Sequence, residues 1–78
     1  MTPQENTIAD IVADVCSNVK VSDADRETPL KDLGVDSLDI ASIFLAIQEQ
    51  LGVRVPDAEI DGLTTVQKIA AYIEANRS

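Results

Sequence analysis

The apolar residues of this chain recur at helical spacing in three separate segments, and this periodicity limits the fold more than any other feature. The first segment follows the spacing i, i+3, i+4, i+7, i+8, i+11 and contains Ile8, Ile11, Val12, Val15, Cys16 and Val19. The second contains Ile40, Ile43, Phe44, Ile47 and Leu51, and the third contains Val66, Ile69, Ala70 and Ile73. The stretch Val53–Pro56 resembles a strand, but no other stretch is available to pair with it. The pattern therefore predicts an all-α fold.

Capping residues set the expected limits of the first two helices. Thr2 is a preferred N-cap and Pro3 suits the first helical position, so the first helix is expected to begin there. The second helix is predicted to run from Ser37 to Gln50, with Gly52 close to its end.

The last third of the chain contains a short helix and a long one. The short helix is predicted over Asp57–Ile60, after an extended connector. Thr64 and Gln67 form a capping-box pattern that predicts the start of the last helix, and Asn76–Ser78 are expected to fray. The expected fold is a small four-helix bundle of three main helices and one short helix, in a single domain over residues 1–78.

Residues 20–36 form a long connection between the first and second helices. A loop of this length is unusual in a compact domain unless it is functional or pinned. We expect Leu30, Leu33 and Val35 to pin it by packing into the core. The segment Asp23–Glu27 resembles a calcium-binding loop only superficially, because it lacks the glycine and the terminal glutamate of an EF-hand, so no metal site is predicted.

Charge and composition exclude several classes of function. Six basic side chains against fourteen acidic ones give a net charge of −8, which opposes binding to nucleic acid or anionic membranes and favours basic protein surfaces. The N-terminus lacks the basic start of a signal peptide, and no apolar run is long enough for a membrane span. A cytoplasmic location without membrane insertion is therefore expected. The chain is also expected to be a monomer.

The chain has no histidine and a single cysteine, Cys16. One thiol cannot form an internal disulfide, and no Cys and His spacing resembles a zinc site. Because Cys16 lies in the first apolar stripe, it is interpreted as a small buried hydrophobic residue.

The second helix is apolar on two faces. Besides its core stripe it carries Leu38, Ala41 and Leu45 on a different face, whereas a surface helix normally has one apolar stripe. So small a chain has few residues left to enclose a second stripe. We therefore expect this stripe to be a docking surface.

Ser37 lies at the mouth of the second helix, between the carboxylates of Asp36 and Asp39. A serine nucleophile needs a base, but no histidine is present, and exposed aspartates are poor bases for an alcohol. No catalytic residue is therefore assigned. Ser37 is either a helix cap in a pure interaction module, a hydroxyl phosphorylated by a kinase, or an attachment point that another enzyme modifies.

The frame Asp32–Asp39, with Asp36-Ser37-Leu38 near its end, resembles the attachment motif of acyl carrier proteins. The resemblance continues through Val55–Asp57, Thr64–Gln67 and Tyr72-Ile73, so it covers essentially the whole chain.

The resemblance implies that Ser37, flanked by Asp36 and Leu38, receives 4′-phosphopantetheine from coenzyme A through a phosphopantetheinyl transferase. The terminal thiol would carry acyl intermediates as thioesters in fatty acid, polyketide or specialised lipid biosynthesis. The implied partners are acyl-transfer, ketosynthase or ligase-type enzymes with basic docking surfaces. An aminoacyl or peptidyl carrier of similar fold, and an unmodified acidic interaction module, remain the alternatives.

The second helix departs from the pattern of carriers in fatty acid synthesis. Those carriers have a second helix rich in glutamate, whereas this chain has Ser42, Gln48 and Gln50 where similarity would place acids. The difference favours a specialised carrier at least as much as the housekeeping one.

Two surfaces are predicted around the second helix. The partner-docking surface comprises its outer positions and the acids after Pro56, namely Leu38, Asp39, Ala41, Ser42, Leu45, Glu49, Asp57 and Glu59. The acyl pocket comprises the inward aliphatic and aromatic positions Ile40, Phe44, Ile47, Val55, Ile60, Leu63 and Ile69. Because the bundle is small, the pocket is expected to open only by a shift of the short helix near Ile60.

Overall fold

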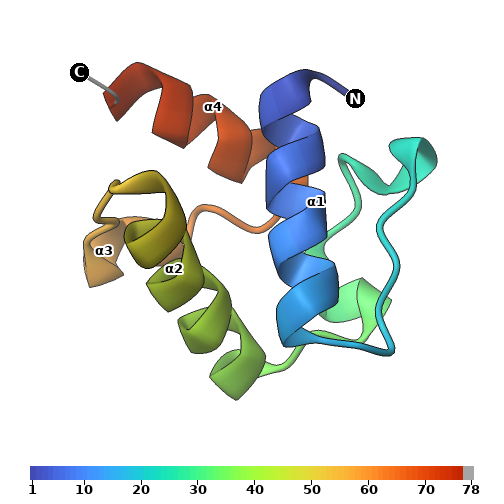
Figure 1. Cartoon of the computed structure of the whole chain (residues 1–78). Coiled ribbons are helices and arrows are strands. Elements are labelled where there is room, and N and C mark those ends of the chain that lie inside the picture. The colour runs from blue at the N-terminus through green and yellow to red at the C-terminus, as the bar shows by residue number, and fades with distance from the viewer. Residues whose placement is uncertain (77–78) are drawn as a thin grey trace.

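The computed structural model describes residues 1–76 and confirms the predicted all-α bundle (Figure 1). Its helices are α1 (Pro3–Val15), α2 (Ser37–Leu51), α3 (Asp57–Ile60) and α4 (Val66–Asn76). Two single turns of 3₁₀-helix, η1 (Asp23–Asp25) and η2 (Leu30–Leu33), lie in the loop between α1 and α2. Within the described residues there is no strand, and Val53–Pro56 is the expected extended connector.

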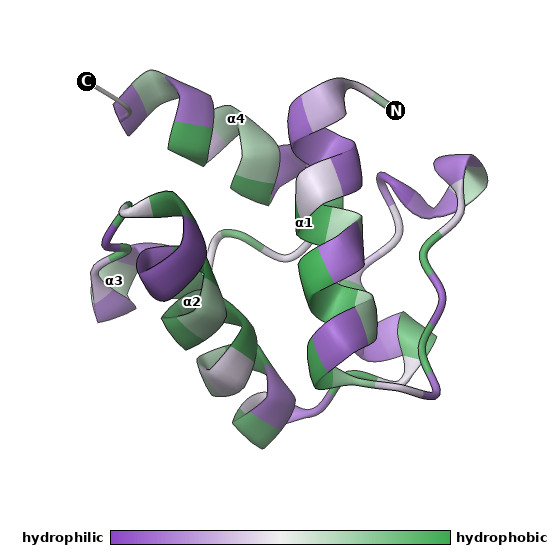
Figure 2. Cartoon of the chain, in the orientation of Figure 1, coloured by the Kyte–Doolittle hydropathy of each residue, from purple (hydrophilic) through white to green (hydrophobic). Residues whose placement is uncertain are grey.

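Helix α1 contacts both α2 and α4, and the core lies between these three helices (Figure 1). Apolar and polar positions interchange along each ribbon, as amphipathic helices require (Figure 2). The side chains with the least exposure are Ile8, Ile11, Val12, Leu30, Ile43, Ile47, Val66, Ile69 and Ile73. All of them except Leu30 come from the three predicted stripes, so the stripes do form the core.

Helix α1 begins as predicted but ends earlier than its apolar stripe suggests. Thr2 is the N-cap, and the helix stops at Val15 with Cys16 as its C-cap. Val19 is nevertheless buried, because a turn brings it back to the core: its N–H donates to the Cys16 carbonyl at 2.8 Å. The prediction of a helix as far as Val19 was therefore wrong, since periodic burial alone does not distinguish a helix from a following turn.

Helix α4 begins one residue later than the predicted capping box. The hydroxyl of Thr65, not that of Thr64, accepts the Lys68 N–H at 3.1 Å, and the Thr65 side chain is buried. Thr64 and Gln67 therefore form no capping box. At the other end the helix includes Asn76, whose side chain donates to the Tyr72 carbonyl at 2.8 Å, and residues 77–78 lie outside the described part of the chain.

The long loop is attached to the bundle by side chains and by backbone hydrogen bonds. Leu30 and Val35 are buried, and Leu33 is half-buried against the core. The Leu30 N–H donates to the Thr64 carbonyl at 2.8 Å, and the Gln67 N–H donates to the Arg26 carbonyl at 3.0 Å. The loop is thus held against the start of α4.

An ion pair joins the first turn of α1 to this loop. Arg26 donates two hydrogen bonds to the carboxylate of Glu5, at 3.0 and 2.7 Å, and the Glu5 side chain is only 5% exposed. The hydrogen bonds from Arg26 hold the pKa of Glu5 below its ordinary value of 4.5, against the opposing effect of burial. Sequence analysis did not identify this pair, whose two residues are 21 positions apart.

Helix α2 ends at Leu51, one residue beyond the prediction. Gly52 follows with φ +69°, a left-handed conformation that favours glycine at a helix C-terminus. Val53 and Val55 are buried in the connector that leads to α3. In the described part of the chain, the helices are too short or too polar to cross a membrane.

Candidate functional site

A left-handed glycine and a capping box place Ser37 on the first turn of α2. Gly34 closes η2 with φ +97°, which lets the chain turn into Asp36, the N-cap of α2. The Asp39 N–H donates to Asp36 Oδ1 at 2.9 Å, and the Asp36 N–H donates to Asp39 Oδ2 at 3.4 Å. Ser37 is therefore next to the cap rather than the cap itself, and it is exposed.

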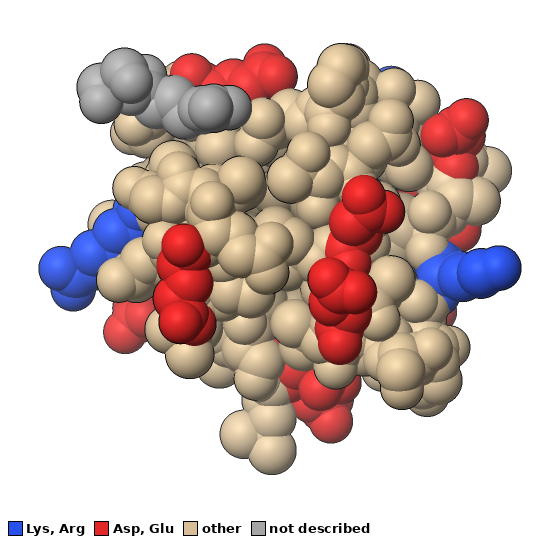
Figure 3. All heavy atoms as spheres, in the orientation of Figure 1, with Lys and Arg blue, Asp and Glu red and all other residues tan. Residues whose placement is uncertain are grey.

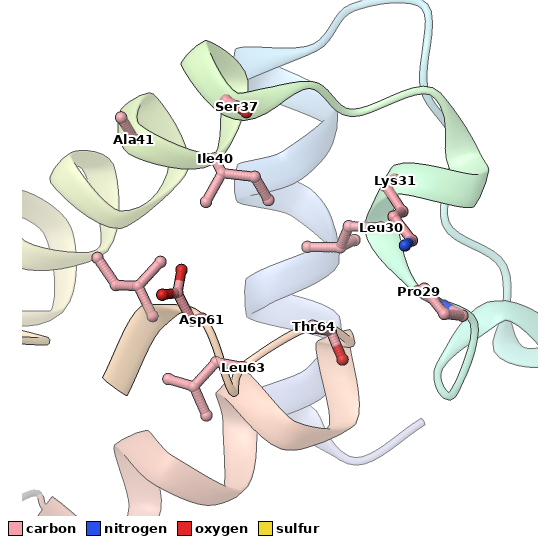
Figure 4. A pocket seen from close by; sticks show the side chains of 10 residues that line it. Pro29, Leu30, Lys31, Ser37, Ile40, Ala41, Asp61, Leu63 and Thr64 are labelled. Carbon is pink, nitrogen blue, oxygen red and sulfur yellow. The ribbon is translucent and has the colours of Figure 1, made fainter. Parts of the chain in front are cut away.

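A pocket of about 390 Å³ lies beside Ser37 (Figure 4). Its walls come from η2, from the first turns of α2 and from the segment between α3 and α4. Its lining residues are Pro29, Leu30, Lys31, Ser37, Ile40, Ala41, Ile60, Asp61, Leu63 and Thr64. The pocket therefore joins one reactive hydroxyl to a mainly aliphatic surface.

The predicted acyl-pocket residues fall into two groups. Ile40, Ile60 and Leu63 line this pocket. The other predicted positions are buried in the core and do not line it, namely Phe44, Ile47, Val55 and Ile69. This pocket is present with α3 in place, while an acyl pocket among the four buried positions, opened by a shift of α3, stays a prediction.

The loop side of the pocket was not predicted. Pro29, Leu30 and Lys31 reach it because the Leu30 N–H is bonded to the Thr64 carbonyl. One usable signal was present, since Leu30 was expected from its apolar character to pack inward. Lys31 and Ser37 line the same pocket because of the path that the loop takes in the folded chain, and no local pattern predicts this.

The predicted docking residues lie on the surface, with one partial exception. Leu38 is 80% exposed and Leu45 is 57% exposed. Asp39 is half-buried, while the others are exposed, namely Ala41, Ser42, Glu49, Asp57 and Glu59. Figure 3 shows acidic side chains dispersed over the face that carries α1 and α2, with basic side chains at its edges.

The surroundings of Ser37 do not activate a nucleophile. Among the described residues that line the pocket, Asp61 is the single carboxylate. The sequence contains no histidine that could act as a base. The Cys16 thiol is buried, and its burial, together with the negative charge of Asp39, raises its pKa. A thiol held protonated in this way is not a nucleophile.

Comparison with known proteins agrees with this arrangement. Residues 6–73 match the family described as "Phosphopantetheine attachment site". An acyl carrier protein of Helicobacter pylori (strain G27) is 38% identical over 72 residues, which cover 87% of this chain and 91% of that protein. An acyl carrier protein of Wolinella succinogenes is 34% identical over 61 residues, covering 77% of this chain and 80% of that protein. The chain therefore belongs to the acyl carrier protein family, whose members are non-catalytic carriers of acyl groups on a covalently attached 4′-phosphopantetheine.

Proposed function

We propose that Ser37 is the residue that carries the 4′-phosphopantetheine, and that the chain presents acyl intermediates to the enzymes of fatty acid, polyketide or specialised lipid biosynthesis. The observation that carries the proposal is the exposed Ser37 at the rim of a mainly apolar pocket. When bound, the group supplies a terminal thiol on which an acyl chain is held as a thioester.

The residues around Ser37 fit this group. The Ser37 side chain is exposed and so accessible to a transferase, and a helix N-terminus favours a negatively charged phosphate attached beside it. Asp36 and Asp39 use carboxylate oxygens within their own capping box, which fixes the turn that exposes Ser37. Leu38 follows as an exposed apolar contact for a partner.

The test is the intact mass of the protein after incubation with coenzyme A and a broad-range phosphopantetheinyl transferase. We expect one addition matching phosphopantetheine in the wild type and none in Ser37→Ala. Ser17→Ala is the matched control, because Ser17 is also exposed but lies outside the predicted docking surface, so the variant should still be modified. Modification of Ser37→Ala at another residue would contradict the assignment. A phosphate already present on the purified protein, with no phosphopantetheine added by the transferase, would favour the kinase alternative.

The pocket supports an aliphatic cargo over an aminoacyl one. Leu30, Ile40, Ile60 and Leu63 offer it an apolar surface, and each buried methylene contributes about 0.8 kcal/mol. An aminoacyl group carries an ammonium that loses solvation in such a pocket.

The cargo is tested by loading a medium-chain acyl group and, separately, an aminoacyl group, and following backbone amide shifts. We expect the acyl group to move the amides of Ile40, Ile60 and Leu63, and the aminoacyl group to affect only residues adjoining Ser37. Equal and local changes for both cargoes would mean that the pocket does not shelter the acyl chain.

The outer face of α2 supports docking of acyl-handling enzymes that offer apolar as well as basic contacts. Leu38, Ala41 and Leu45 form its apolar stripe, and Glu49 is its exposed acid near the C-terminal end. The scarcity of acids on this face supports a specialised pathway at least as much as housekeeping fatty acid synthesis.

A further inference from the structure

Two side chains of opposite charge lie on the pocket beside Ser37, and they come from different elements. Lys31 belongs to η2, and Asp61 belongs to the turn after α3 (Figure 4). Among the lining residues that the structure describes, Lys31 is the only cation. Within residues 1–76 no ion pair occupies its ammonium, whereas Arg26 is paired with Glu5.

A phosphate attached at Ser37 would be surrounded mainly by negative charge. Asp36 and Asp39 flank the attachment point, Asp61 lies on the pocket, and the whole chain carries a net charge of −8. The N-terminus of α2 offsets part of this repulsion, but its effect is confined to the first turn. The exposed Lys31, which is among the residues that line the same pocket, is the remaining source of positive charge.

We propose that Lys31 forms an ion pair with the phosphodiester of the prosthetic group and so holds the near end of the arm at the mouth of the pocket. The proposal rests on the proposed attachment at Ser37. Lysine suits this role because its ammonium is a compact point charge on a flexible four-carbon stem, and it binds phosphate without demanding a fixed geometry. Asp61 repels the same phosphate and so biases it towards η2.

Lys31 is thus a positioning residue. By fixing the phosphate, it shortens the part of the arm that moves freely and directs the remainder over the apolar wall formed by Leu30, Ile40 and Leu63. The exposed side chain has no other partner in the described structure, so its removal should not disturb the fold.

The experiment is phosphorus NMR of the purified holo-protein, in the wild type and in Lys31→Gln, Lys31→Arg and Lys20→Gln. In the wild type the phosphate should tumble with the protein and give a broad line, because it is held. Lys31→Gln should give a narrower and shifted line, and Lys31→Arg should restore most of the wild-type width. Lys20→Gln removes the same charge from a separate groove beside α1, so it should leave the line unchanged.

Salt provides an independent check on the ion pair. At an ionic strength of about 0.01 M the Debye length is about 30 Å, and at about 1 M it is about 3 Å, so the wild-type line should narrow towards that of Lys31→Gln as salt is added. Identical lines for the wild type and Lys31→Gln at low salt would overturn the proposal, as would an equal effect of Lys20→Gln. Melting curves of all four proteins verify that the fold is intact.

These outcomes are separate from those that test attachment. If Ser37 is not modified, no holo-protein with a phosphate at Ser37 forms, and the mass measurement shows that the proposed function has failed. If the holo-protein forms and its phosphorus line does not depend on Lys31, only the ion pair is disproved.

Discussion

Helices α1 and α2 begin with the same local device but lie in different surroundings. Each has a capping box, formed by Thr2 with Glu5 in α1 and by Asp36 with Asp39 in α2. In α1 the acid of the box is buried and paired with Arg26 from the loop. In α2 the box has no basic partner among the described residues, and Ser37 stands exposed beside it.

The difference shows that a capping box does not reveal whether a helix N-terminus is structural or functional. What distinguishes the two cases is whether a residue distant in the sequence covers the helix N-terminus. Arg26 covers the start of α1 and joins it to the loop, so that end of the helix belongs to the core. The start of α2 has no such cover, which leaves its first turn accessible to a transferase and to partner enzymes.

Among changes at the two capping boxes, the largest expected effect on stability comes from removing Arg26. Arg26→Leu leaves the Glu5 carboxylate buried without its cation, so we expect the melting temperature to fall on the order of 10 °C. Glu5→Gln should cost less, because glutamine can keep the capping-box hydrogen bond and leaves no buried charge. Thermal melts at pH 7 measure both, and equal melting temperatures for Arg26→Leu and the wild type would show that the ion pair is not structural.

At low pH, the difference in stability between Arg26→Leu and the wild type should disappear. The pKa of Glu5 is lowered in the folded protein, so the stability from the pair is fully present above 4.5, the ordinary value, and is lost as the pH falls below it. The gap between wild type and Arg26→Leu should therefore be widest near neutral pH and should shrink in acid. Urea unfolding across this range measures the gap, and a constant gap would contradict the assignment to Glu5.

The caps themselves should contribute similarly at the two helices. Thr2→Ala and Asp36→Ala each remove the side-chain acceptor of an N-cap, and each should cost about 0.5–2 kcal/mol. Urea unfolding measures the two losses side by side. A much larger loss for Asp36→Ala would mean that the start of α2 is tied into the fold as firmly as the start of α1.

The smallest expected effect on stability is that of Leu45→Arg, on the outer face of α2. Leu45 is 57% exposed, so the melting temperature of the Leu45→Arg variant should change little. Acyl transfer to cognate enzymes should weaken, because the variant places a bulky cation on the docking stripe. Ile43→Ala is the contrasting variant, since Ile43 is fully buried and its truncation should cost about 2–5 kcal/mol. Unfolding of Leu45→Arg would show that Leu45 contributes to the core.

Features that depend on local pattern could be predicted from the sequence. The three stripes predicted the core helices because burial follows helical spacing, and the start of α1 followed from Thr2 and Pro3. The capping of α4 was misplaced by one residue because Thr64 and Thr65 are equally good caps locally. Only the fold, which uses the Thr64 carbonyl to hold Leu30, distinguishes them.

Features that depend on distant contacts could not be predicted. The exposure of Leu38 and Leu45 followed from the second stripe on α2, but the wall of the pocket did not. Lys31 borders the pocket of Ser37 because the loop folds back onto the segment before α4. Likewise, no local pattern connects Glu5 with Arg26.

The two backbone hydrogen bonds that hold the long loop also determine where the sequence is free to vary. A main-chain bond does not depend on the side chain beside it, so exposed loop positions such as Ala24 and Glu27 can accept many residue types without releasing the loop. Proline is the exception, because it has no N–H to donate. Placed at Leu30 or Gln67, it would remove one of the two donors and detach the loop from α4 at that point. At these two positions, proline is therefore the one substitution that selection would remove because of its effect on the backbone alone.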